Sequence, residues 1–127
     1  MKITQEINSN KLSKFIAKSM DGKKAENIII INLKKIKNSV TDYFVLATGN
    51  SNIHIESIAS GVEYDVFKKF NEKPWNKEGV NNSEWVLIDF VNVVAHIFNP
   101  DTRENYNLEK LWGDGDLLNN YNEKTKK

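Results

Sequence analysis

The chain contains no cysteine among its 127 residues, only two histidines and only two prolines. The lack of cysteine excludes disulfides, thiolate zinc sites and cysteine nucleophiles. No apolar run approaches the ~20 residues that a membrane-spanning helix needs. The first ten residues, Met1 to Asn10, also lack the apolar core of a signal peptide. We therefore expect a cytoplasmic protein that does not engage a membrane.

The chain also lacks a strong charge of either sign. Its 18 lysines and arginines and its 17 aspartates and glutamates leave a formal net charge of +1. A protein that held RNA mainly through phosphates would be far more basic, because such binding depends on Lys and Arg displacing counterions. The balance therefore favours a protein partner or a small ligand over direct binding of nucleic acid.

Apolar periodicity predicts an alternation of helices and strands. The helices are expected over 7–20, from a cap at Ser51 or Asn52 to about residue 71, over 102–107 and over 108–112. The strands are expected over 28–31, over 42–48, briefly near Gly79-Val80, over 85–90 and over 93–98. This order predicts an α/β fold, in which helices pack on a mixed β-sheet.

The length suits a single domain with one hydrophobic core. Hydrophobic residues make up 39% of the chain and charged residues 28%, which is typical of a soluble globular protein. We expect the domain to cover residues 7–114, with tails at 1–6 and 115–127. The end of the chain, rich in lysine and asparagine, is expected to fray.

The strand expected at 85–90 has two different faces. Val86, Ile88 and Phe90 alternate on one side and should face the core. Trp85, Leu87 and Asp89 lie on the other side. A tryptophan, an aliphatic residue and a charge suit a partly exposed binding surface, for which tryptophan is an efficient anchor. The other interpretation, that Trp85 packs beneath a terminal helix, is equally open.

Catalytic patterns are weak. Gly49-Asn50-Ser51 superficially resembles a phosphate-binding loop, and Gly49 is expected to supply a backbone conformation that other residues resist. Nucleotidyl transfer, however, needs clustered carboxylates to hold Mg²⁺, and Asp89 stands alone in its strand. No Walker pattern and no G-x-G-x-x-G is present. We expect no enzyme activity, no metal site and no cofactor.

His96 lies in an expected strand, between Ala95 and Ile97. The favoured interpretation is a structural histidine whose ring bonds a backbone or side-chain oxygen, because buried polar groups need partners. The other interpretation is a ligand role. A place in a binding interface is compatible with either burial state of this side chain.

Five blocks of sequence stand in a recognisable order. They are 42–45 with 48–51 (DYFV and TGNS), 78–79 (EG), 85–89 (WVLID), 93–98 (VVAHIF) and 103–112 (RENYNLEKLW). Together they resemble the signature of the RsfS/Iojap family of ribosome-silencing factors over nearly the whole chain. One departure is Val91-Asn92, which stands where the family usually has Gly-Asp.

The resemblance implies a nucleotidyltransferase-like fold without that chemistry. It also implies a protein that binds the large ribosomal subunit through its ribosomal protein fourteen. The bound factor would then sterically block the small subunit and repress translation when nutrients are scarce. Family members can homodimerise when free. Two alternatives remain: a large-subunit assembly factor, and a nucleotide-binding or nucleotidyltransferase-like enzyme.

The expected partner-binding residues come from the last three blocks and the turn between two of them. They are Trp85, Leu87, Asp89, Asn92, His96, Arg103, Tyr106, Glu109 and Trp112. The last four form a C-terminal cluster that either meets the partner or closes the core. Within it, Arg103 and Glu109 are expected to pair, which at an exposed position adds only about 0–1 kcal/mol.

Overall fold

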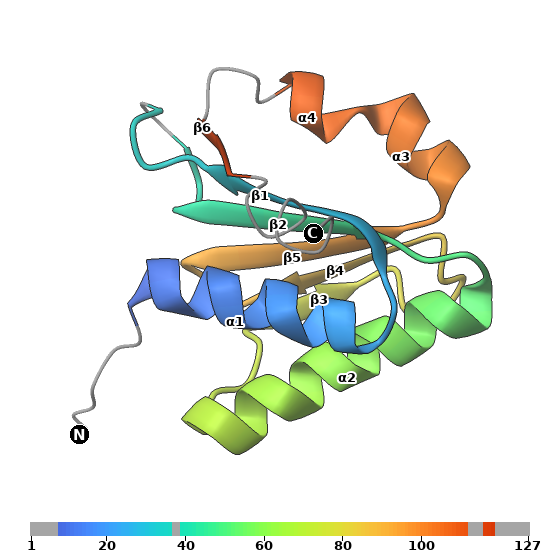
Figure 1. Ribbon diagram of the computed structural model, residues 1–127, viewed down its shortest axis with the longest axis horizontal. Helices are drawn as coiled ribbons and strands as arrows, with labels where there is room; N and C mark the ends of the chain where they lie inside the picture. The colour runs from blue at the N-terminus through green and yellow to red at the C-terminus, as the bar shows by residue number, and fades with distance from the viewer. Residues whose placement is uncertain (1–7, 37–38, 112–115, 119–127) are drawn as a thin grey trace, which may run out of the picture.

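A computed structural model describes residues 8–36, 39–111 and 116–118, without the side chains of 109, 111 and 116–118. Within these residues, one six-stranded sheet has the order β3-β4-β5-β2-β1-β6 (Figure 1). The strands are β1 (Glu26–Asn32), β2 (Tyr43–Thr48), β3 (Asn76–Glu78), β4 (Trp85–Asp89), β5 (Val93–Phe98) and β6 (Asp116–Leu118). β2 and β5 are parallel, and the other neighbours are antiparallel. The predicted α/β fold with a mixed sheet is therefore confirmed.

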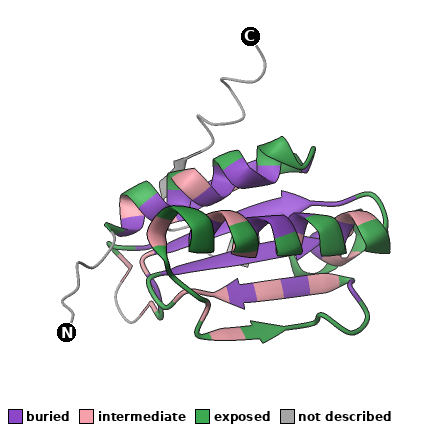
Figure 2. Ribbon diagram, turned by 90° about the horizontal axis from the view of Figure 1, so that it is seen from below, coloured by how far each residue is buried: buried purple, intermediate pink, exposed green. Residues whose placement is uncertain are grey.

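Two layers of helices enclose the sheet. Figure 1 shows α1 (Ser9–Gly22) and α2 (Asn52–Phe70) beneath one face, which we call the inner face. The short helices α3 (Pro100–Tyr106) and α4 (Leu108–Leu111) lie over the opposite, outer face. Because both faces are covered, β2 and β5 are buried along their whole length (Figure 2).

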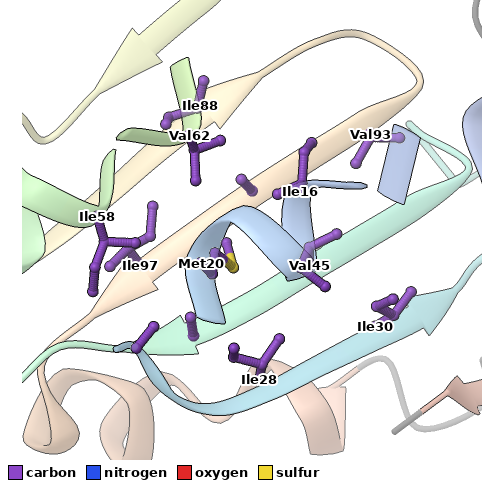
Figure 3. Close-up of a cluster of buried hydrophobic side chains, with 14 of the residues drawn as sticks. Ile16, Met20, Ile28, Ile30, Val45, Ile58, Val62, Ile88, Val93 and Ile97 are labelled. Atoms are coloured by element: carbon purple, nitrogen blue, oxygen red, sulfur yellow. The ribbon is translucent and has the colours of Figure 1, made fainter. Parts of the chain in front are cut away.

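The main core lies between the inner face and the two long helices (Figure 3). Ile16 and Met20 of α1 and Ile58 of α2 are fully buried there, against Val45 of β2 and Ile97 of β5. Fully burying a side chain of this size contributes about 1.5–3 kcal/mol. This packing holds the sheet in place, and the sheet in turn supports the side chains and the short helices on the outer face.

The long helix α2 has the ends that its sequence predicts. The Ser51 side chain accepts the backbone N–H of His54 at 3.0 Å, which satisfies one free amide of the first turn. Asn71 ends the helix with a left-handed backbone, φ +58°. Figure 2 shows the exposed side of the same helix in green. The predicted cap at Ser51 and the predicted end at about residue 71 are confirmed.

The two edge strands differ from expectation. A strand was expected near Gly79-Val80, whereas β3 ends at Glu78. Gly79 has a φ of +81° and accepts the N–H of Ser83 through its carbonyl, so it begins the turn toward β4. The pairing of β6 with β1 was not expected, and it lies in the segment assigned to a polar tail. The rest of the expected tails, 1–6, 115 and 119–127, falls outside the described residues.

The backbone conformation of Gly49 also differs from expectation. Its φ is not in the positive range, so no special backbone conformation requires glycine there. A Cβ atom at this position would instead lie 2.6 Å from Cγ1 of Ile55. Glycine is needed because the first turn of α2 packs directly against the end of β2. The likeness to nucleotidyltransferases remains a prediction.

Candidate partner-binding surface

An aromatic cluster occupies one end of the outer face. Trp85 of β4 stands opposite Phe98 of β5, with ring centroids 5.5 Å apart. The ring of Tyr106, at the end of α3, has its centroid 4.6 Å from the ring centroid of Trp85. Phe98 is fully buried, Trp85 is partly buried and Tyr106 is 58% exposed. The cluster therefore rises from a buried base to an exposed edge, as a protein-binding surface requires.

His96 joins this cluster from the neighbouring position on β5. The indole N–H of Trp85 donates to His96 Nδ1 at 3.1 Å, and the two rings lie 6.0 Å apart. The side chain was expected to bond an oxygen if structural. That expectation was wrong in its partner, because the ring accepts an indole N–H. Only 3% of the residue is exposed, so it supports the surface from beneath.

The surroundings of His96 keep its ring uncharged. Burial lowers the pKa of His96 from 6.5 to about 3, because a desolvated imidazolium is unfavourable. Within the described part of the chain, no three histidines, aspartates or glutamates gather as a metal site would require. A buried, neutral acceptor of one hydrogen bond is well suited to hold a neighbouring side chain in place.

Arg103 anchors α3 to the sheet. Its guanidinium is buried, donates from Nη1 to the hydroxyl of Thr48 at 2.8 Å, and lies 5.9 Å from the centroid of Phe98. Asn99 caps the helix by accepting the N–H of Thr102 at 2.8 Å. The side chain of Glu109 and all of Trp112 lie outside the described residues. The expected pairing of Arg103 with Glu109 stays a prediction.

The remaining expected residues separate into two groups. Leu87 stands opposite His96 and packs partly buried on the outer face. Asp89 and Asn92 instead build the turn at the far end of β4 and β5. The N–H of Val91 donates to Asp89 Oδ1 at 2.7 Å, and the Asn92 carbonyl accepts the N–H of Asp42 at 3.1 Å. The structure thus does not bring Asp89 and Asn92 into the aromatic cluster.

The turn itself has an unusual residue at its centre. Val91 has a φ of +79°, and the N–H of Asn92 donates to the carbonyl of Phe90 at 3.0 Å. A β-branched residue resists this conformation, which glycine adopts freely. Thr41 helps to hold the turn, because its hydroxyl donates to the Val91 carbonyl at 2.9 Å. The turn thus has the conformation that suits glycine although valine occupies it.

Sequence reasoning missed the central role of Phe98, which alternation places on the same face as His96. It also missed exposed aromatics on the inner-face side of the molecule. Tyr64 and Phe67 of α2 line a cavity of about 420 Å³ together with Ser60, Glu63, Glu72 and Lys73. Trp75, which precedes β3, is 75% exposed. The sequence could have indicated that Trp75 is exposed, because this residue follows Pro74 and belongs to no apolar stripe.

Within the described residues, no helix combines the length and the apolar character that crossing a membrane requires.

Comparison with known proteins supplies the family. A family model described as "Ribosomal silencing factor during starvation" (RsfS) matches residues 6–127. Ribosomal silencing factor RsfS of Bacillus subtilis is 37% identical over 111 residues, covering 87% of this chain and 92% of that protein. Mouse mitochondrial assembly of ribosomal large subunit protein 1 is 39% identical over 74 residues, covering 57% of this chain and 32% of that protein.

A solved structure agrees with this assignment. The crystal structure of a Chromobacterium violaceum protein has a TM-score of 0.79 to this chain at 30% identity, and the match covers 84% of this chain and 88% of that one. The fold, the family model and the relatives of nearly full length all lead to one conclusion. The chain belongs to the RsfS family of ribosomal silencing factors.

Proposed function

We propose that this protein docks on the large ribosomal subunit with the outer-face surface around Trp85. The contact is with ribosomal protein fourteen of that subunit. The docked protein then blocks the small subunit sterically and represses translation when nutrients are scarce. One observation carries the proposal: in a chain of this family, a partly exposed tryptophan and an exposed tyrosine stand together on a buried aromatic base.

The surface has the composition of a docking site. Interfaces concentrate their binding energy in a few aromatic and arginine side chains held in well-packed surroundings. Trp85, Leu87 and Tyr106 are the side chains that we propose to meet the partner. His96 and Arg103 are buried: His96 accepts the indole N–H of Trp85, and Arg103 anchors α3, which carries Tyr106. Asp89 and Asn92 would form a polar rim at the far end of the strands.

We further propose that the protein acts in the cytoplasm by occupying a surface, without catalytic turnover. Its potency then follows its affinity and its copy number. The formal net charge of +1 supports contact with a ribosomal protein over RNA phosphates as the main mode of binding. A turnover of any nucleotide that depends on Asp89 would contradict this part of the proposal.

The free protein, by the same reasoning, forms a homodimer. A partly exposed apolar face is the kind of surface that a second copy can cover. Sedimentation equilibrium of the wild-type protein and of Trp85→Ala tests this. We expect a dimer that the substitution weakens, whereas a wild-type monomer at all concentrations would contradict it.

The central test is co-sedimentation with purified large subunits in a sucrose gradient. Trp85→Ala should lose binding while keeping its fold, as circular dichroism reports. Trp75→Ala is the matched control, because Trp75 is also an accessible tryptophan but lies outside the aromatic cluster. It should bind as the wild-type protein does. If the wild-type protein travels neither with large subunits nor with isolated ribosomal protein fourteen, the proposal fails.

A second candidate function is assembly of the large subunit. It is favoured by the name of the mouse relative, a protein of mitochondrial large-subunit assembly. Both functions use the same surface but differ in timing. Ribosome profiles of a deletion strain separate them. Precursors that accumulate during growth support assembly, and defects confined to starvation support silencing.

A further inference from the structure

The two ring nitrogens of His96 have different surroundings. Nδ1 accepts the indole N–H of Trp85 at 3.1 Å, whereas Nε2 is buried and has no hydrogen-bond partner within the described residues. In the pairing of β4 with β5, His96 stands opposite Leu87 and Trp85 stands opposite Phe98. The bond therefore runs diagonally between the strands, a distance that only long or aromatic side chains cover.

The direction of this hydrogen bond fixes the protonation of the ring. A neutral imidazole that accepts at Nδ1 carries its proton on Nε2, and an imidazolium cannot accept at all. Burial lowers the pKa of His96 to about 3, so the ring stays neutral at physiological pH. Nδ1 is therefore an acceptor for the indole N–H of Trp85 at physiological pH.

The ring is also held in place. The Phe44 ring meets the imidazole edge to face, with ring centroids 4.6 Å apart. The Phe98 ring stacks on the imidazole, with ring centroids 6.1 Å apart. For stability alone, an apolar ring would fill the same space without leaving a buried donor unpaired at Nε2. What the imidazole adds over an apolar ring is one fixed acceptor, without which the indole N–H of Trp85 would lose its hydrogen bond.

We infer that His96 is a positioning residue, whose Nδ1 fixes the partly exposed indole of Trp85 in one orientation before a partner docks. The inference rests on the proposed function and deepens it. Because the fixed orientation is reached during folding, docking does not have to immobilise this side chain. Because the indole N–H points inward, the partner meets only the apolar ring atoms of Trp85. The matching patch on the ribosomal protein is therefore apolar and needs no acceptor there.

A double-mutant cycle tests the inference. His96→Phe keeps an aromatic ring but removes the acceptor, and Trp85→Phe removes the donor. In the wild-type background, His96→Phe should weaken binding to large subunits about 3- to 10-fold, the scale of immobilising one side chain. In the Trp85→Phe background it should have no further effect. An equal loss in both backgrounds would show a merely structural role and overturn the inference.

A spectroscopic measurement on the free wild-type protein tests the inference even where a variant does not fold. Nitrogen-15 NMR should show His96 with its proton on Nε2, and the indole N–H of Trp85 should exchange slowly with solvent. Exchange should become faster in His96→Phe. A proton on Nδ1 of His96, or an indole N–H that exchanges as fast as that of Trp75, overturns the inference.

The two tests also separate this inference from the proposed function. If the wild-type protein does not bind large subunits, the proposed function fails and with it the role in docking. The NMR result then still decides whether His96 orients Trp85 at all. If the wild-type protein binds but the cycle shows no coupling, the docking surface stands and the positioning role of His96 is overturned.

Discussion

The ring centroids of Trp85 and Tyr106 lie 4.6 Å apart, although one residue begins β4 and the other ends α3. The contact joins the sheet to the short helix above it. Because Tyr106 is 58% exposed, its ring contributes more to the surface than to the core. We predict that Tyr106→Ala lowers affinity for large subunits about tenfold or more, as truncation of an interface anchor does. The same change should cost less than about 1 kcal/mol of unfolding free energy.

Tyr64→Ala is the matched control for this prediction. Tyr64 is 60% exposed but lies on α2, on the inner-face side of the molecule. Affinity is measured by co-sedimentation at several protein concentrations, and stability by urea denaturation. Equal losses of affinity in the two variants would show that the surface around Trp85 has no special role.

A second prediction concerns Val91, whose φ of +79° is a conformation that a β-branched residue resists. Holding a non-glycine residue in such a region costs on the order of 1–3 kcal/mol. Glycine removes this cost but adds about 0.4–1 kcal/mol through the freedom of the unfolded chain. Because Val91 is 56% exposed, little packing is lost. Val91→Gly should therefore raise the unfolding free energy by about 1 kcal/mol.

The control for this change is Val40→Gly. Val40 is also an exposed valine, but its φ is not positive. Glycine there should leave stability unchanged or lower it by up to about 1 kcal/mol, since only the unfolded chain gains freedom. Thermal or urea denaturation measures both variants. A loss of stability in Val91→Gly would show that the turn is not strained.

Alternation of apolar residues was enough to predict which side of β4 faces the core. Val86 and Ile88 pack under the inner face, and Trp85 and Leu87 lie on the outer face. The same signal could not place β3, because its three residues are polar, one of them half-buried and two exposed. Its strand conformation comes from pairing with β4 at the edge of the sheet. Such pairing is a tertiary effect that no local pattern contains.

The contacts of the candidate site were less predictable than its members. The sequence places Trp85 and His96 in neighbouring strands, but only the register of those strands makes their side chains diagonal neighbours. A shift of one residue would turn His96 to the opposite face. The anchoring of Arg103 on Thr48 likewise joins segments 55 residues apart. These relationships depend on topology, and periodicity carries no information about them.

A third prediction follows from the low pKa of His96, about 3 in the folded protein against 6.5 as its ordinary value. Between these values the unfolded chain binds a proton that the folded protein does not. The contribution to the unfolding free energy that comes from keeping His96 neutral is therefore fully present above pH 6.5. This contribution is lost as the pH falls toward 3. The slope from this residue alone approaches about 1.4 kcal/mol per pH unit.

Urea denaturation at a series of pH values measures this slope. The control is His96→Phe, in which all other titrating groups remain. Its stability should fall less steeply between pH 6.5 and pH 4 than that of the wild-type protein. Parallel curves for the two proteins would mean that the pKa of His96 is the same in the folded protein as in the unfolded chain.

The last prediction concerns Gly79, which supports the backbone of Trp85. A Cβ atom at this position would lie 1.9 Å from the carbonyl oxygen of Trp85, and the φ of +81° is itself unfavourable for alanine. Backbone atoms cannot move aside as the end of a flexible side chain can. Gly79→Ala should therefore lower the unfolding free energy by at least about 2 kcal/mol. It should also weaken ribosome binding, because Trp85 must shift.

Gly22→Ala provides the comparison. An added Cβ at Gly22 meets no atom within 4 Å, and the residue ends α1. Alanine there should leave stability unchanged or raise it by up to about 1 kcal/mol, because glycine is a poor helix residue. Denaturation and co-sedimentation of both variants measure the difference. If Gly79→Ala is as stable as Gly22→Ala and binds large subunits normally, Trp85 does not depend on the close approach of its neighbouring turn. The orientation of its side chain must then be set by the outer-face contacts alone.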